Sequence, residues 1–159
     1  MLSKLNSEII SFFPVHIQKL FLEVPREILE NACEIRFRTS RPIIISRFSD
    51  DYLIRYQVSA QDIIRLIENF SNNSIYSIQN EINQGFMTIR GGHRIGISGT
   101  SVWEDNRIKN LKYISSINIR IAREVKNCSV KLIQTIAKDE FQNTLLISPP
   151  RIWKNYSFA

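Results

Sequence analysis

Cysteine, histidine and glycine are all scarce in this chain of 159 residues. There are two cysteines, Cys33 and Cys128, two histidines, His16 and His93, and five glycines. Because the cysteines form no C-x-x-C pair and no secretory leader is visible, we expect reduced thiols in a cytoplasmic protein. The histidines lie far apart with no cysteine at ligand spacing, which argues against a zinc site or any other bound metal.

Long apolar runs and catalytic signatures are missing too. No window approaches eighteen uninterrupted apolar residues, so we expect no membrane span. No serine sits in a G-x-S-x-G elbow, and no carboxylate pair has the pattern of a general acid and a general base. These absences argue against an ordinary hydrolase or redox enzyme.

Positive charge is in excess, and it is placed unevenly. The formal net charge is +6. Up to Gln84 the chain has 9 basic and 10 acidic residues, whereas from Gly85 onward it has 12 basic and 5 acidic residues. The surplus in the second half can face nucleic acid, a phosphate-bearing ligand or an acidic protein surface, and composition alone does not choose among them.

The apolar periodicity predicts alternating blocks of helices and antiparallel strands. Helices are expected over residues 1–31, 59–71 and 74–84, and again from Ser129. Strands are expected over residues 34–38, 42–45, 52–58, 86–90, 94–101, 108–113, 117–122 and 143–147. The phenylalanines of the first block are interpreted as core or docking surface.

The order of these blocks predicts an α+β fold, in which N-terminal helices and antiparallel meanders pack on helices. The first βα portion of an α/β domain is expected to follow. The predicted boundaries are an N-terminal helical segment at 1–31, an α+β domain at 32–124, and a linker helix with the first strand of a second domain at 125–159.

A glycine-rich stretch, RGGHRIGISG, lies between two predicted strands. Gly91 and Gly92 predict a tight turn with positive φ, whereas Gly96 and Gly99 predict close packing or a bulge. Since the stretch leads into a strand and not into a helix, it does not match a dinucleotide-binding fingerprint.

Arginines recur on the predicted strands. Arg36 and Arg38 are expected on the exposed face of the first meander. A second set comprises Arg90, Arg94, Arg120 and Arg123. These side chains either lie on a solvated face or reach phosphate oxygens, for which the planar guanidinium is suited. A ligand-facing role for His93 is a further alternative.

The last predicted strand runs into a possible phosphate-binding loop. A GxxxxGK[ST] loop needs glycines, so that backbone N–H groups can surround phosphates. Counted from Ser148, the Gly-Lys-Thr positions hold Trp153, Lys154 and Asn155, and Trp153 is predicted to prevent the loop from working. The remnant of a nucleotide site would comprise Ser148, Pro149, Pro150, Arg151 and Lys154.

Four segments carry a family resemblance: EIRFRTSRP, SIYSIQNEINQGFMTIRGGHRIGISGTSV, ISSINIRIAREVKNC and NTLLISPP. Their order and spacing resemble the stage III sporulation protein AA family of the type II/IV secretion ATPase superfamily. The resemblance implies an N-terminal domain joined to a RecA-like ATPase domain that uses ATP and magnesium in a homo-oligomeric ring. It also implies a mother-cell cytoplasmic protein that energises a channel towards the forespore, with channel membrane proteins as partners.

Within this resemblance, the chain is expected to be a truncated fragment that hydrolyses no ATP and binds no cofactor by itself. Arg94, Arg120 and Arg123 are the candidates for facing phosphate. A frameshift is our hypothesis for the tail, because reading one nucleotide later turns the codons of Trp153 and Lys154 into GGA, a glycine codon. The shifted frame can then restore Gly-Lys-Thr-Thr.

Two other functions stay open. A nucleic-acid-binding module would use the basic second half with Phe86 and Tyr113, although the aromatic residues mostly alternate with apolar ones and look like core. A structural oligomerisation domain would instead use the phenylalanine-rich N-terminal helices.

Overall fold

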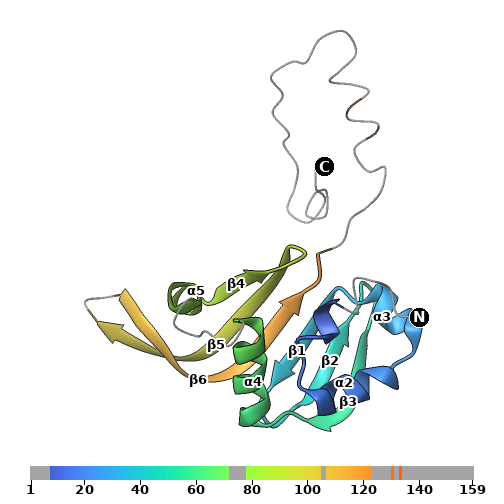
Figure 1. Cartoon of the computed structure of the whole chain (residues 1–159), viewed down its shortest axis with the longest axis horizontal. Helices are drawn as coiled ribbons and strands as arrows, with labels where there is room; N and C mark the ends of the chain where they lie inside the picture. The colour runs from blue at the N-terminus through green and yellow to red at the C-terminus, as the bar shows by residue number, and fades with distance from the viewer. Residues whose placement is uncertain (1–7, 72–77, 105–106, 123–129, 131–132, 134–159) are drawn as a thin grey trace. The chain divides into compact units, whose positions relative to one another are not determined.

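The computed structural model describes residues 8–71, 78–104, 107–122, 130 and 133. Two compact units make up the chain, Met1–Ile121 and Ala122–Ala159, and the elements named below belong to the first. The helices are α2 Val15–Leu22, α3 Arg26–Asn31, α4 Ala60–Phe70 and α5 Gln79–Gln84. The strands are β1 Glu34–Arg38, β2 Pro42–Ser46, β3 Asp51–Gln57, β4 Phe86–Ile89, β5 His93–Glu104 and β6 Arg107–Arg120 (Figure 1).

These strands form one antiparallel sheet in the order β3-β2-β1-β6-β5-β4. The sequence predicts two meanders, and the pairing of β1 with β6 joins them, with Ile35 opposite Ile119 and Phe37 opposite Ile117. The predicted break between strands 108–113 and 117–122 is wrong. A single strand, β6, runs through Tyr113, where φ is 49°, and it pairs with β5 on both sides of that residue. The α+β fold class is confirmed.

One face of the sheet is buried under the helices, and the core lies between them (Figure 1). Phe37 of β1 is buried, while its neighbours Arg36 and Arg38 are exposed, which confirms the predicted alternation. Phe13 packs edge-on against Phe21 and Phe37, with ring centroids 5.1 and 5.2 Å apart. Phe13 and Phe21 therefore belong to the core and not to an exposed docking surface.

A buried carboxylate, Asp62, ties α4 to the elements around it. Its Oδ2 accepts hydrogen bonds from the backbone N and Oγ of Ser59, both at 2.8 Å, and from the Tyr56 hydroxyl at 2.9 Å. His16 Nε2 on α2 donates to its Oδ1 at 2.8 Å. The backbone N of Asp62 donates to Ser59 Oγ, which completes the predicted capping box. Burial alone raises the pKa of Asp62, but these hydrogen bonds outweigh it and lower the pKa below its ordinary value.

Glycines shape the strand connections as predicted. Gly91 and Gly92 turn the chain between β4 and β5 with φ of 87° and 76°. Gly99 lies where the register between β5 and β6 shifts, and a Cβ added there would lie 2.8 Å from the carbonyl oxygen of Lys112. The close approach of the two backbones therefore requires glycine at this bulge.

Several predicted features fall outside the described residues. Of the helix expected from Ser129, only Val130 and Ile133 are described, and both are helical. The strand at 143–147, with any RecA-like portion, is not among the described residues, and the three domain boundaries stay predictions. Among the described residues, no helix combines the length and the apolar character that crossing a membrane requires.

Candidate phosphate-binding face

The face of the sheet away from the helices carries two adjacent arginines, Arg94 on β5 and Arg120 on β6, here called the arginine pair. They lie directly opposite each other in strand register, and both are exposed. Two of the three arginines predicted to face phosphate are thus side by side. Arg123 lies outside the described residues, and Arg90 is exposed at the turn after β4.

The arginine pair concentrates positive charge with little compensation. Like charges at directly opposed positions of antiparallel strands destabilise a sheet. Glu34 of β1 lies opposite Arg120, but its Oε1 accepts a hydrogen bond from Nε of Arg36. The Arg94 guanidinium stacks over the Phe86 ring, 4.1 Å from the ring centroid. An anion between the two guanidiniums would relieve their repulsion, so the pair is suited to phosphate oxygens.

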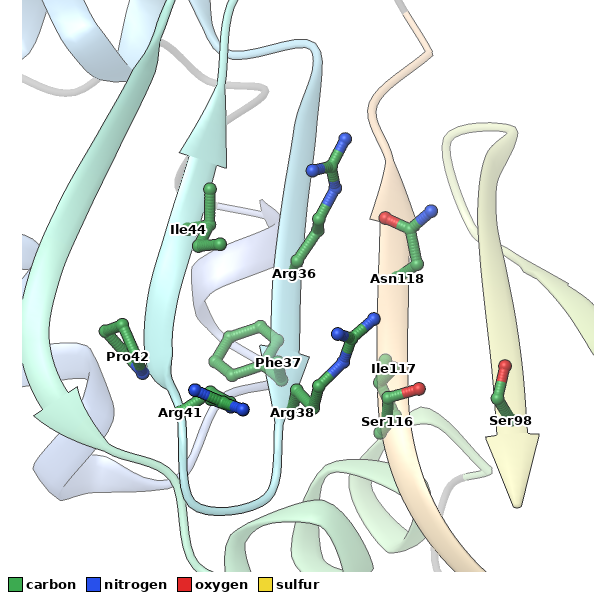
Figure 2. A pocket seen from close by; sticks show the side chains of 10 residues that line it. All are labelled: Arg36, Phe37, Arg38, Arg41, Pro42, Ile44, Ser98, Ser116, Ile117 and Asn118. Carbon is green, nitrogen blue, oxygen red and sulfur yellow. The ribbon is translucent and has the colours of Figure 1, made fainter. Parts of the chain in front are cut away.

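A larger basic cavity, here called the β1 pocket, adjoins the arginine pair along β6. Its volume is about 580 Å³. Its polar lining consists of Arg36, Arg38, Arg41, Ser98, Ser116 and Asn118 (Figure 2). Asn118 also lines the smaller cavity that holds the arginine pair, so the two cavities are neighbours along β6.

The arginines of the β1 pocket differ in their charge partners. Arg36 forms an ion pair with Glu34, and the hydrogen bond to this carboxylate raises the pKa of Arg36 above its ordinary value. Within the described part of the chain, neither Arg38 nor Arg41 has a carboxylate partner. Two guanidinium charges in one pocket are therefore left uncompensated.

The local sequence explains why these arginines line one pocket. Arg38 is the last residue of β1, and the backbone N of Arg41 donates to the carbonyl of Arg38 at 3.0 Å across a turn in which Ser40 has φ of 60°. The sequence placed Arg36 and Arg38 on an exposed face but assigned no site there, and it did not single out Arg41. Three arginines within one strand-turn segment were the signal that could have found the site.

The residues that β5 and β6 contribute to the β1 pocket carry no such local sequence signal. Ser116 and Ser98 lie opposite each other in strand register, and Ser116 lies opposite Arg38 of β1. In Figure 2 the Asn118 side chain lies between β1 and β5, with Oδ1 towards β1 and Nδ2 towards β5. Only the pairing of β1 with β6 brings these hydroxyl and amide groups to the arginines.

The described residues offer donors for the phosphate part of a nucleotide. Guanidiniums, hydroxyls and an amide suit phosphate oxygens. Among the described residues, no group of three or more histidine, cysteine, aspartate or glutamate side chains could hold a metal ion. The predicted loop remnant, from Ser148 to Arg151 with Lys154, lies outside the described residues.

His93 does not face this surface. Its side chain is fully buried, at 0% exposure, and burial lowers its pKa below the ordinary value. A Cβ added at Gly91 would lie 2.8 Å from its Nε2, so the imidazole fills the inside of the β4–β5 turn. The ligand-facing alternative is therefore wrong for His93.

Comparison with known proteins identifies related sequences along nearly the whole chain. The family model described as Sporulation stage III, protein AA matches residues 3–157. The stage III sporulation protein AA of Bacillus subtilis is 32% identical over 148 residues, which are 93% of this chain and 48% of that protein. The chain thus spans about half the length of this curated relative.

Solved structures show a weaker likeness. The ATPase DotB of Legionella pneumophila is 14% identical with a TM-score of 0.40, over 77% of this chain and 35% of that one. The VirB11 ATPase of the Brucella suis type IV secretion system, solved in complex with sulphate, is 15% identical with a TM-score of 0.41, over 80% and 36%. At these scores neither likeness adds to the argument from the residues.

Proposed function

Because this chain belongs to the Sporulation stage III, protein AA family, we propose that it supplies the N-terminal domain of a sporulation ATPase that energises a mother-cell-to-forespore channel. The intact protein would bind ATP and magnesium and work as a cytoplasmic homo-oligomeric ring against channel membrane proteins. The family membership and the resemblance of the four sequence segments support this proposal.

The observation that carries the proposal is the arginine pair. Arg94 and Arg120 are exposed and directly opposed in register, and among the described residues neither forms an ion pair with a carboxylate. Guanidiniums held in this way can contact the phosphates of a nucleotide that a neighbouring ATPase domain binds. The role of this domain would be to cap the nucleotide, and Arg123 is proposed as a third contact.

A chimera tests the role of the arginine pair. Residues 1–147 would be joined to the Bacillus subtilis relative from the position after the one that matches Ile147, so that the relative supplies the whole phosphate-binding loop, and ATP turnover would be measured. We expect Arg94→Gln/Arg120→Gln to lower turnover at least about tenfold, because phosphate charge loses its stabilisation. The charge-matched control Arg55→Gln/Arg65→Gln alters exposed arginines elsewhere and should change turnover by less than about twofold. Equal turnover in both variants would refute the role of the pair.

The chain by itself is proposed not to hydrolyse ATP. Trp153 occupies the position at which the loop needs a glycine, and an indole there prevents backbone N–H groups from surrounding phosphates. Purified chain should show only background ATP turnover. Turnover above background that is lost on Lys154→Ala would contradict this.

Nucleic-acid binding is the second candidate, and the exposed arginine face favours it. Against it, Phe86 is half-buried beneath Arg94, so this ring is not available for stacking with a base. Tyr113 is 84% exposed and is the better stacking candidate of the two. A steep fall in oligonucleotide affinity with added salt, weakened by Tyr113→Ala, would favour this candidate over the first.

A further inference from the structure

The β1 pocket has a ligand chemistry of its own, apart from the arginine pair. We propose that it binds a small phosphate monoester, with Arg38 and Arg41 on the phosphate and the Ser116 hydroxyl as a further donor. This inference does not depend on a neighbouring ATPase domain, because all of these groups belong to the described part of one domain.

Charge is the first reason. Glu34 neutralises Arg36, whereas Arg38 and Arg41 have no carboxylate partner among the described residues. A dianion would compensate both charges at once. A monoester phosphate carries nearly two negative charges at neutral pH, which matches the two uncompensated guanidiniums.

The directions of the donors are the second reason. Arg38 lines the pocket from β1, Arg41 from the turn that follows it, and Ser116 from β6, while Ser98 lies beyond it on β5 (Figure 2). A planar carboxylate is satisfied by a single guanidinium fork, whereas a phosphate presents three strong acceptor oxygens in different directions. Donors spread over three strands therefore favour phosphate over carboxylate.

The shape and the apolar side of the pocket are the third reason. Its volume of about 580 Å³ lies within the range of small-molecule sites and exceeds what one phosphate needs. Pro42 and Ile44 of β2, both half-buried, line the side opposite Ser98. They can contact the carbon atoms of an esterified group, so an organic phosphate fits better than a free phosphate ion.

Titration of the full chain with glycerol 3-phosphate, followed by calorimetry at low and constant ionic strength, tests the site. We expect saturable binding that Arg38→Gln/Arg41→Gln weakens by about tenfold or more, because two charge-assisted contacts are lost. The charge-matched control Arg55→Gln/Arg65→Gln lies outside the pocket and should weaken binding by less than about twofold. Urea denaturation of each variant checks that its fold is intact.

Four outcomes overturn the inference. Absence of saturable binding does so, and so does an equal loss in the two charge-matched variants, which would indicate diffuse electrostatic attraction. A loss confined to Arg94→Gln/Arg120→Gln also overturns it, but leaves the proposed capping role of the arginine pair standing. Tighter binding of a hexaglutamate peptide than of the phosphate would assign the pocket to an acidic protein instead, and would likewise overturn it.

The same headgroup can come from a soluble metabolite or from a lipid. Sedimentation with vesicles that contain phosphatidic acid, a lipid with a monoester phosphate, separates the two sources. If the chain sediments with these vesicles and Arg38→Gln/Arg41→Gln prevents it, the site is supported and its source is the membrane. If only glycerol 3-phosphate binds, the site is supported with a soluble source.

Discussion

Gly99 lies at the bulge where the backbones of β5 and β6 approach closely, and replacing it by alanine should destabilise the domain. A Cβ at this position would lie 2.8 Å from the Lys112 carbonyl oxygen and 2.9 Å from the Ile114 Cα. Both neighbours are backbone atoms, so they cannot give way by rotating a side chain. Overpacking of this kind costs about 1–3 kcal/mol of unfolding free energy.

Gly96 on the same strand provides the matched control. A Cβ there would lie 3.7 Å from the Asn118 carbonyl oxygen and 3.8 Å from the Asn118 Cβ, which are ordinary contact distances. Gly96→Ala should therefore change the unfolding free energy by no more than about 0.5 kcal/mol. Both substitutions reduce the backbone freedom of the unfolded chain, so the difference between them isolates the steric clash.

Urea denaturation followed by circular dichroism measures this difference. We expect the midpoint of Gly99→Ala to lie below that of Gly96→Ala at an unchanged slope, because the native state and not the surface exposed on unfolding is affected. Equal midpoints for the two variants would show that the β5–β6 backbones do not approach as described. The bulge would then need another explanation.

Three further predictions concern the core, the buried carboxylate and the arginine pair. Phe37→Ala should lower the free energy of unfolding, measured by urea denaturation, by about 3–5 kcal/mol, because the ring is fully buried. Leu53→Ala on the exposed face should lower it by less than about 0.5 kcal/mol. Similar losses in the two variants would contradict the assignment of the buried and exposed faces. Asp62→Asn should cost about 1–3 kcal/mol at neutral pH. The pKa of Asp62 is lower in the folded state than its ordinary value of 3.8, so its contribution to the free energy of unfolding is complete above pH 3.8. This contribution is lost as the pH falls through the folded pKa. The urea midpoints of the wild type and of Asp62→Asn should therefore converge in acid. Added salt should stabilise the wild type more than Arg94→Gln, because screening weakens the repulsion between Arg94 and Arg120, and an equal salt effect would show that they do not repel each other.

The local pattern was sufficient for most elements of the first unit. Alternation placed Phe37 inside and Arg36 and Arg38 outside, and the capping pair Ser59 and Asp62 fixed the start of α4. These features depend on residues close together in the chain. The sheet order depends on long-range pairing of β1 with β6, for which neither strand carries a signal of its own.

The residues of the candidate site likewise differ in whether the local sequence or long-range strand pairing places them. Arg94 and Arg120 are candidates for facing phosphate on the sequence alone, and strand register places them side by side. The β1 pocket was not predicted, because its serines and asparagine reach the arginines only through tertiary pairing. Conversely, His93 belongs to a glycine-rich stretch that suggested a ligand, but the turn of Gly91 and Gly92 folds its ring inward.

The pairing of β1 with β6 also constrains how the protein is made. While the ribosome synthesises the chain, β1 emerges early with only β2 and β3 to pair with, and its other edge stays open until residues 116–120 have left the exit tunnel. During that interval Ile35 and Phe37 lie at an unprotected edge, to which a second nascent chain can pair. The charged side chains Arg36 and Arg38, which alternate with them, disfavour such pairing during synthesis, independently of any ligand.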